Sequence, residues 1–134
     1  RVGSGYFATE FNDDVAQNIR TVGNEFGTTT GRPRRIGWLD TVVLRHSKRV
    51  SGINHLSVML LDVLTGLKEL KICTNYLLDG KVIDHIPSNI KDYNKCKPVY
   101  ITLPGWEEDI TSVTSFEELP KNAQNPLLKI IRLM

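Results

Sequence analysis

Residues 68–86, with the sequence KELKICTNYLLDGKVIDHI, decide the fold class of this 134-residue chain. Both ends of the stretch are rich in apolar and β-branched residues, which predicts one strand over residues 68–77 and a second over residues 81–86. Asp79-Gly80 lies between them, and an Asp-Gly pair between two such runs is a strong hairpin signal. The stretch therefore predicts a sheet built around two antiparallel strands.

Two helices are predicted on the N-terminal side of this hairpin. Apolar residues recur at helical spacing over residues 11–22 and again over residues 39–50. Gly23 and Gly52 stand where a glycine commonly ends a helix. The residues between the two helices, 24–37, contain threonines, glycines and a proline without periodicity, which predicts a loop.

The other elements are shorter. Residues 56–61 form an apolar run that predicts a strand, a turn is expected at residues 63–66, and residues 88–95 predict a short helix. Residues 99–103 predict a further strand, which Pro104-Gly105 ends. Helices and strands thus alternate around one hairpin, and this pattern predicts an α/β fold, a mixed sheet with flanking helices.

A final helix is predicted near the end of the chain. Ser115 and Glu118 have the spacing of a capping box, in which two side chains satisfy free N–H groups at the start of a helix. Pro126 lies inside this helix and is expected to kink it, because its ring clashes with the preceding turn. The predicted buried face consists of Phe116, Leu119, Ala123, Leu127 and Ile130.

Composition limits the classes of protein that fit. Hydrophobic residues make up 40% of the chain and the net charge is only +2, which does not by itself indicate a nucleic-acid or membrane partner. Cys73 and Cys96 lack the spacing of a zinc or redox site, and Cys73 is predicted to be a buried free thiol. The chain starts at Arg1 without a methionine and stops abruptly at Met134, so we interpret it as part of a longer protein.

Few other side chains suggest chemistry. The three histidines, His46, His55 and His85, have no second histidine or carboxylate at ligand spacing, so the sequence predicts no metal site and no catalytic histidine. Trp106 is predicted to anchor the core or a loop. The sequence gives no mechanism for Pro104-Gly105-Trp106.

The segment from Thr28 to Arg35, TTTGRPRR, is the strongest candidate for a binding site. Consecutive hydroxyls and free backbone N–H groups can surround a carboxylate or a phosphate with donors. If the loop is extended, Arg32 and Arg34 share one side, and two guanidinium groups there suit a dicarboxylate beside a nucleotide. The alternative is a solvated basic loop or a patch that contacts nucleic-acid phosphates.

Asp62 is a second candidate, because it follows the apolar run of residues 56–61. A carboxylate at the C-terminal end of a strand is well placed for a ligand in an α/β sheet. It can accept two hydrogen bonds from the N1 and N2 edge of guanine, an edge that adenine lacks. The alternative is a structural role, in which Asp62 caps the turn at residues 63–66.

Several short stretches, taken in order along nearly the whole chain, resemble adenylosuccinate synthetase. They are Arg1-Val2-Gly3-x-Gly5, residues 23–27 (GNEFG), residues 29–35 (TTGRPRR), residues 37–40 (GWLD), residues 62–66 (DVLTG), residues 70–73 (LKIC), residues 98–100 (PVY) and residues 103–106 (LPGW). The resemblance implies a GTP-dependent ligase that joins IMP to L-aspartate and converts GTP to GDP and phosphate with Mg²⁺. GTP first phosphorylates the 6-oxygen of IMP, and the amino group of aspartate then displaces the phosphate.

The resemblance also implies roles for particular residues. The aspartate loop would consist of Thr28, Thr29, Thr30, Gly31, Arg32, Pro33 and Arg34. Val2 and Arg32 would contact IMP, and the GTP-binding residues would be Arg34, Leu60, Leu61 and Asp62. Some relatives carry a lysine at the position of Leu60, so this chain lacks a long side chain there that could pack on the base.

The resemblance further implies that residues 1–134 are the C-terminal substrate-binding part of a larger P-loop-like ligase. The family's phosphate loop, catalytic aspartate and histidine, and Mg²⁺ ligands belong to an N-terminal part, and a second guanine-contacting loop lies near the family's C-terminus. The isolated chain is therefore expected to be inactive, with no catalytic residue and no metal ligand of its own. The full-length protein is expected to be a cytoplasmic homodimer that contacts neither membranes nor nucleic acid. The alternative function is a small anion- or nucleic-acid-binding module that uses the loop from Thr28 to Arg35.

Overall fold

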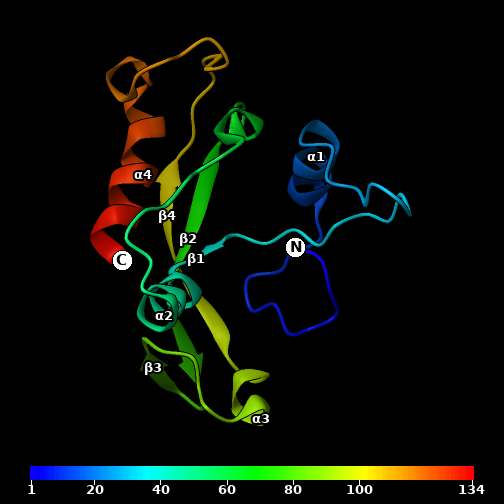
Figure 1. The fold of residues 1–134 in the computed structure, drawn as a ribbon, viewed down its shortest axis with the longest axis vertical. Coiled ribbons are helices and arrows are strands. Elements are labelled where there is room, and N and C mark those ends of the chain that lie inside the picture. The colour runs from blue at the N-terminus through cyan, green and yellow to red at the C-terminus, as the bar shows by residue number, and fades with distance from the viewer.

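Strand β2 (Glu69–Leu78) organises the sheet, because every other strand pairs with it. The computed structural model describes residues 1–134. Strand β4 (Lys97–Pro104) runs antiparallel to β2 along one edge, and β3 (Lys81–Ile83) runs antiparallel to it along the other. The two-residue strand β1 (Leu39–Asp40) pairs with β2 in parallel. The predicted mixed sheet with flanking helices is confirmed (Figure 1).

The predicted hairpin is present, although its second strand is shorter than expected. Asp79 and Gly80 both have positive φ, 48° and 79°, as the two central residues of a type I′ turn require. Strand β3 ends at Ile83 instead of Ile86. Beyond that point the carbonyl oxygen of Asp84 accepts a hydrogen bond from the guanidinium of Arg45.

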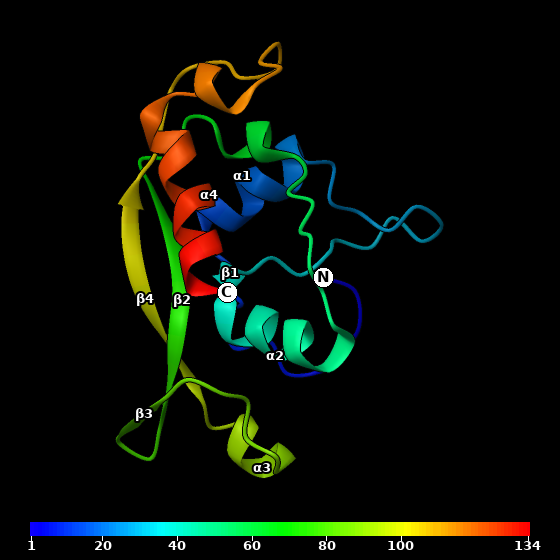
Figure 2. The same cartoon turned by 60° about the vertical axis from the view of Figure 1, so that its left-hand side comes forward.

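Helices α1 (Asp14–Val22) and α2 (Thr41–Ser51) confirm the two N-terminal predictions. The Asp13 side chain caps α1, and the Asp40 carboxylate accepts hydrogen bonds from two N–H groups at the start of α2. Gly52, with a φ of 64°, ends α2. The helix begins two residues later than predicted, since Leu39 and Asp40 form β1. Figure 2 shows α2 and α4 (Lys121–Leu133) on one side of the long β2–β4 pair.

The predicted strand at residues 56–61 is wrong. Residues 54–59 make no backbone–backbone hydrogen bond, and Leu60 has a positive φ of 57°. No strand of the sheet pairs with the apolar run, although β1, β3 and β4 each pair with β2 alone. The run leads into a short 3-10 helix, η1 (Leu61–Leu64), where a turn was expected from residue 63.

The predicted capping box is also wrong. Ser115 makes no capping hydrogen bond, and the residues after it form a separate 3-10 helix, η2 (Phe116–Glu118). The Glu118 carboxylate instead accepts a hydrogen bond from the backbone N–H of Thr114. Helix α4 starts only after Pro120, so Phe116 and Leu119 do not belong to its buried face.

The buried face of helix α4 agrees in part with the face predicted from the spacing of apolar residues. Ala123 and Ile130 are buried as predicted, Leu127 is half-buried, and Pro126 is itself buried. The helix continues through Pro126 without interruption. A further helix, α3 (Ile90–Tyr93), lies within the range predicted for it. No helix has both the length and the apolar character needed to cross a bilayer.

The buried residues form two clusters along the sheet. One contains Val42, Cys73, Tyr76 and Cys96, and the other contains Leu70, Trp106 and Ala123 among its members. Both cysteines are buried free thiols, which confirms the prediction for Cys73. Burial raises the pKa of the Cys73 thiol to about 12.

Candidate functional site

The loop predicted to bind anions is a narrow hairpin. Phe26 and Pro33 form an isolated antiparallel bridge, and inside it the N–H of Gly27 donates to the carbonyl of Arg32 at 2.8 Å. The N–H of Gly31 donates back to the carbonyl of Gly27, also at 2.8 Å, and Gly31 has a φ of 64°. This left-handed backbone is the reason for a glycine at that turn. The hairpin projects away from the sheet in both views (Figures 1 and 2).

The tip of the hairpin carries free polar groups. Thr28, Thr29, Thr30 and Arg32 are all exposed. Among their side chains only the Thr30 hydroxyl has an internal hydrogen bond, a long one of 3.4 Å from the N–H of Arg32. The Arg32 guanidinium has no hydrogen-bond or ion-pair partner within the chain. Its five donors are therefore available to a ligand.

Arg34 is held from two sides. Its Nη1 donates to Glu25 Oε2 at 2.9 Å, and its carbonyl accepts a hydrogen bond from Nε of the buried Arg20 at 3.0 Å. Its own Nε is buried without a partner. These contacts place the Arg34 guanidinium at the base of the hairpin, beside Glu25.

Arg35 ties the hairpin to the beginning of the chain. Its Nε and Nη2 form a two-pronged contact with the Glu10 carboxylate at 2.8 and 2.7 Å, and Nη1 donates to the carbonyls of Gly3 and Gly5. This pairing lowers the pKa of Glu10. Val2 lies in the segment that Arg35 holds, and its side chain is 79% exposed. The structure therefore brings Val2 to the base of the hairpin that carries Arg32 and Arg34.

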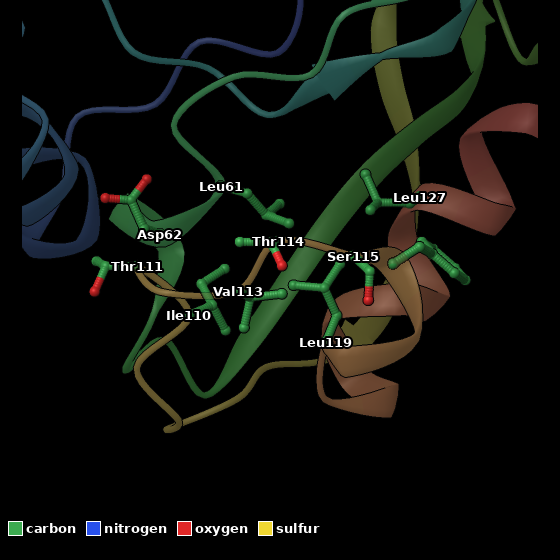
Figure 3. Close-up of a pocket in the computed structure, with 10 residues that line it drawn as sticks. Leu61, Asp62, Ile110, Thr111, Val113, Thr114, Ser115, Leu119 and Leu127 are labelled. Carbon is green, nitrogen blue, oxygen red and sulfur yellow. The ribbon is translucent and has the colours of Figure 1, made fainter.

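Asp62 lies in η1 with an exposed side chain. Its carboxylate makes no hydrogen bond or ion pair within the chain, so the alternative role as a cap for the turn is wrong. Asp62 and Leu61 border a pocket of about 510 Å³ whose other wall includes Ile110 and Val113. Figure 3 shows that the Asp62 carboxylate points away from these apolar side chains, at the edge of the pocket.

The hairpin base and the Asp62 turn meet at the end of α1. Glu25, the partner of Arg34, lines a cavity of about 250 Å³ together with Leu60 and Leu61. A Cβ atom on Gly23 would approach the Val63 side chain within 3.3 Å, so the two segments are in close contact. Arg34 and the turn, which the family resemblance implies both contact GTP, are thus neighbours. The apolar side chain of Leu60 is exposed and can contact a ligand or another protein segment.

Sequence reasoning missed the residues that position the arginines. Glu10, Arg20 and Glu25 decide which arginine is free, yet none has a local pattern that reveals its partner. Glu25 does lie in the quoted stretch at residues 23–27, which is the one signal that could have identified it. The chain contains no group of three or more His, Cys, Asp or Glu side chains that could hold a metal ion.

Comparison with known proteins gives the family of the chain. The family model described as adenylosuccinate synthetase matches residues 1–134. Curated adenylosuccinate synthetases from Limosilactobacillus reuteri and Staphylococcus saprophyticus are 58% and 60% identical over 133 residues, which is 99% of this chain and 31% of theirs. The structure of a fully ligated adenylosuccinate synthetase from Plasmodium falciparum matches with a TM-score of 0.93 and 40% identity, over 99% of this chain and 32% of that one. The chain spans about a third of the length of these relatives, and it belongs to the adenylosuccinate synthetase family.

Proposed function

We propose that this chain is the substrate-binding part of a GTP-dependent ligase that joins IMP to L-aspartate. It supplies the aspartate loop, from Thr28 to Arg34, and one side of the guanine site at residues 60–62. Support comes from the two groups of unpaired polar side chains, at the hairpin tip and at Asp62, which are linked through the end of α1. These are the positions that match the family's binding stretches.

The unpaired guanidinium of Arg32 carries the proposal for aspartate binding. Arg34 and Arg35 already have carboxylate partners inside the chain, whereas Arg32 has none. An arginine beside threonine hydroxyls offers two-pronged, charge-assisted hydrogen bonds to a carboxylate. Arg32 therefore binds an aspartate carboxylate and, on its other side, the IMP ribose, which the exposed Val2 also contacts in the proposed complex.

The guanine side rests on the free carboxylate of Asp62. In the proposed complex it accepts hydrogen bonds from N1–H and N2–H of the base, while Leu60 and Leu61 provide apolar contact. Arg34 donates to Glu25 through Nη1 alone, so in the proposed complex its Nη2 donates to a GTP phosphate. Positioning and charge neutralisation of this kind are the main contributions that a protein makes to phosphoryl transfer.

In the proposed reaction the γ-phosphate of GTP moves to the 6-oxygen of IMP, and GDP leaves. The aspartate amine then attacks C6 and displaces inorganic phosphate, which gives adenylosuccinate. In both steps the residues of this chain hold and orient substrates. Mg²⁺ would neutralise phosphate charge, and because this chain has no cluster of metal ligands, we propose that its protein ligands lie outside these 134 residues. A cytoplasmic homodimer is part of the same proposal.

The alternative, a nucleic-acid-binding module, lacks support. It requires three arginines of the loop to face phosphates together. Two of them already pair with carboxylates at the base of the hairpin, Arg34 with Glu25 and Arg35 with Glu10, so the three do not form one basic surface. The remaining Arg32 is one positive charge on a narrow hairpin, which is a small electrostatic footprint for a nucleic-acid backbone.

Substitution of Arg32 tests the proposal in a full-length synthetase that carries this stretch. Arg32→Ala removes charge-assisted hydrogen bonds to aspartate and is expected to raise the KM for aspartate by a factor of about 30. The KM for IMP should rise less, by about fivefold, because one hydrogen bond to the ribose is lost, and the KM for GTP should be unchanged because Arg32 has no proposed contact with GTP. Steady-state kinetics, with IMP, aspartate and GTP varied one at a time, gives the KM for each substrate.

The matched control is Arg49→Ala. Arg49 is an exposed arginine on α2 that forms no ion pair, so its removal changes the net charge by the same amount at a different place. The control should leave all three KM values unchanged. An Arg32→Ala enzyme with the wild-type KM for aspartate, or a control with the same loss, would contradict the proposed role.

A further inference from the structure

The turn that carries Asp62 is fixed by the residues that follow β4. After Pro104 the chain crosses directly over residues 65–68. The N–H of Gly105 donates to the carbonyl of Lys68 at 2.9 Å, and the N–H of Gly66 donates to the carbonyl of Trp106 at 2.8 Å. Two backbone segments about 40 residues apart in the sequence are therefore joined immediately behind η1.

This crossing is too close for any side chain at residue 105. A Cβ atom on Gly105 would lie 1.7 Å from the carbonyl oxygen of Leu67, far inside a van der Waals contact. Glycine is therefore a steric requirement here. The Asn122 amide of α4 donates to the Gly105 carbonyl at 2.9 Å and holds the crossing from the other side.

Trp106 adds a side-chain bond to the same crossing. Its ring is buried, with 2% exposure, and its indole N–H donates to the Thr65 hydroxyl at 2.9 Å. Thr65 in turn closes the turn, because its backbone N–H donates to the carbonyl of Asp62 at 3.1 Å. A short chain of hydrogen bonds thus runs from Trp106 through Thr65 to the backbone of Asp62.

The turn is also held by packing, since Val63 is buried near Gly23 at the end of α1 and Leu61 and Leu64 pack on the core, but its side chains make few hydrogen bonds. Leu60, at its start, has a positive φ and provides no side-chain cap, and the Asp62 carboxylate is free. The segment before it, residues 54–59, makes no backbone–backbone hydrogen bond. The hydrogen bonds from the crossing through Thr65 therefore link the position of Asp62 to the chain after β4.

We propose that Thr65 and Trp106 are positioning residues that set the selectivity of the site for the purine base of the nucleotide. The inference rests on the proposed role of Asp62 and extends it. A carboxylate can bind N1–H and N2–H of guanine together only if both of its oxygens lie within hydrogen-bond reach of one base edge. Hypoxanthine offers N1–H alone, so a correctly placed carboxylate favours GTP over ITP.

The same connection joins the two walls of the adjoining pocket. The segment that follows Trp106 leads to Ile110 and Val113, which face Leu61 across the pocket (Figure 3). Ile110 and Trp106 belong to one buried cluster, and Leu61 packs against it. Loss of the Trp106–Thr65 bond would loosen the Asp62 wall relative to the other wall.

The test compares Thr65→Val with Thr65→Ser in a full-length synthetase that carries this stretch. Valine keeps the shape but removes the hydroxyl, which accepts from the indole N–H and donates to the Glu108 carbonyl at 3.4 Å, whereas serine keeps it. We expect Thr65→Val to raise the KM for GTP about fivefold, the equivalent of one hydrogen bond, and to reduce the preference for GTP over ITP. The KM for aspartate should be unchanged. Thr65→Ser should keep the wild-type KM for GTP and the wild-type preference for GTP over ITP. Trp106→Phe, which removes the donor and keeps an aromatic ring, should have the same effect as Thr65→Val.

Asp62→Asn separates this inference from the proposed function. If it leaves the GTP-over-ITP preference intact, Asp62 does not read the base and both proposals about this turn fail. If it abolishes the preference while Thr65→Val leaves it at the wild-type level, only the positioning role is overturned. A lower melting temperature for Thr65→Val with an unchanged preference also overturns it, because it would show that the bond is merely structural.

Discussion

Three arginines within four residues have three different environments. Arg32 is free at the hairpin tip, Arg34 pairs with Glu25 beside the Asp62 turn, and Arg35 pairs with Glu10 and holds residues 3–5. Only the first offers all its donors to a ligand. Arg35, which is the nearest in sequence to Arg34, has a structural role.

The Glu10–Arg35 pair makes a prediction about acid stability. The hydrogen bond from Arg35 lowers the pKa of Glu10 below its ordinary value near 4.5. A lowered carboxylate pKa contributes stability above the unfolded pKa and loses that contribution as pH falls through the folded one. Glu10→Gln should therefore be less stable than wild type at pH 7, and the difference should shrink below about pH 4. Urea unfolding of the chain at both pH values measures it.

The control for this prediction is Glu117→Gln, which removes an exposed carboxylate without an ion pair. Its effect on the free energy of unfolding should be small at both pH values. A Glu10→Gln effect that is the same at pH 7 and below about pH 4 would show that the pair does not titrate as described.

At the scale of elements, Asp40 links the sheet to α2. It lies in β1, and its carboxylate accepts two N–H groups of α2 and the hydroxyl of the buried Tyr76 on β2. Burial and this neighbouring carboxylate raise the pKa of Tyr76, so the phenol remains a donor. One side chain therefore ends a strand, begins a helix and satisfies a core hydroxyl.

Substitutions at Asp40 and Tyr76 should have unequal costs. Asp40→Ala removes the cap and leaves the Tyr76 hydroxyl without its acceptor, so we expect a loss of about 2 kcal/mol or more in the free energy of unfolding. Tyr76→Phe removes one hydrogen bond and leaves the cap intact, with an expected loss of about 1 kcal/mol. Equal losses in urea unfolding would contradict this division of roles.

At the scale of the whole molecule, the uncovered apolar run at residues 56–61 is the most unusual feature. Met59 is 78% exposed, and Leu56, Val58 and Leu60 are also exposed. The run borders a cavity of about 390 Å³ lined mainly by apolar side chains, among them Leu39 and Ile130. Isolated apolar side chains on a surface are ordinary, whereas a contiguous set such as this one is typical of a surface that another element covers.

The isolated 134-residue chain should therefore bind the dye ANS under native conditions. The double substitution Val58→Ser and Met59→Ser removes exposed apolar surface and should reduce the ANS fluorescence without changing the far-UV circular dichroism. The corresponding control, Val22→Ser and Val50→Ser, removes two exposed valines on α1 and α2 that lie outside this cavity. Equal fluorescence from all three proteins would show that residues 56–61 do not form the dye site.

Local sequence alone predicts the parts of the fold that are set by the backbone preferences of adjacent residues. The Asp79-Gly80 hairpin, the end of α2 at Gly52 and the loop character of residues 24–37 follow from local backbone preferences. The short motifs, in their order along the chain, likewise indicate the family without any knowledge of the fold. The errors at residues 56–61 and at Ser115 came from local patterns that were correct in form, an apolar run and a capping spacing, but that lacked the required partners.

Three features depend on contacts across the fold: which arginine is free, the absence of a capping bond from Asp62, and the need for Gly105 and Trp106 after β4. These contacts join distant segments: Arg35 with Glu10, Arg34 with Glu25, and Trp106 with Thr65. A strand likewise needs a partner, and residues 56–61 lie beside no strand of the sheet that pairs with them. Such contacts depend on how the chain returns to itself, and local composition carries no record of that because backbone preferences act over only a few residues.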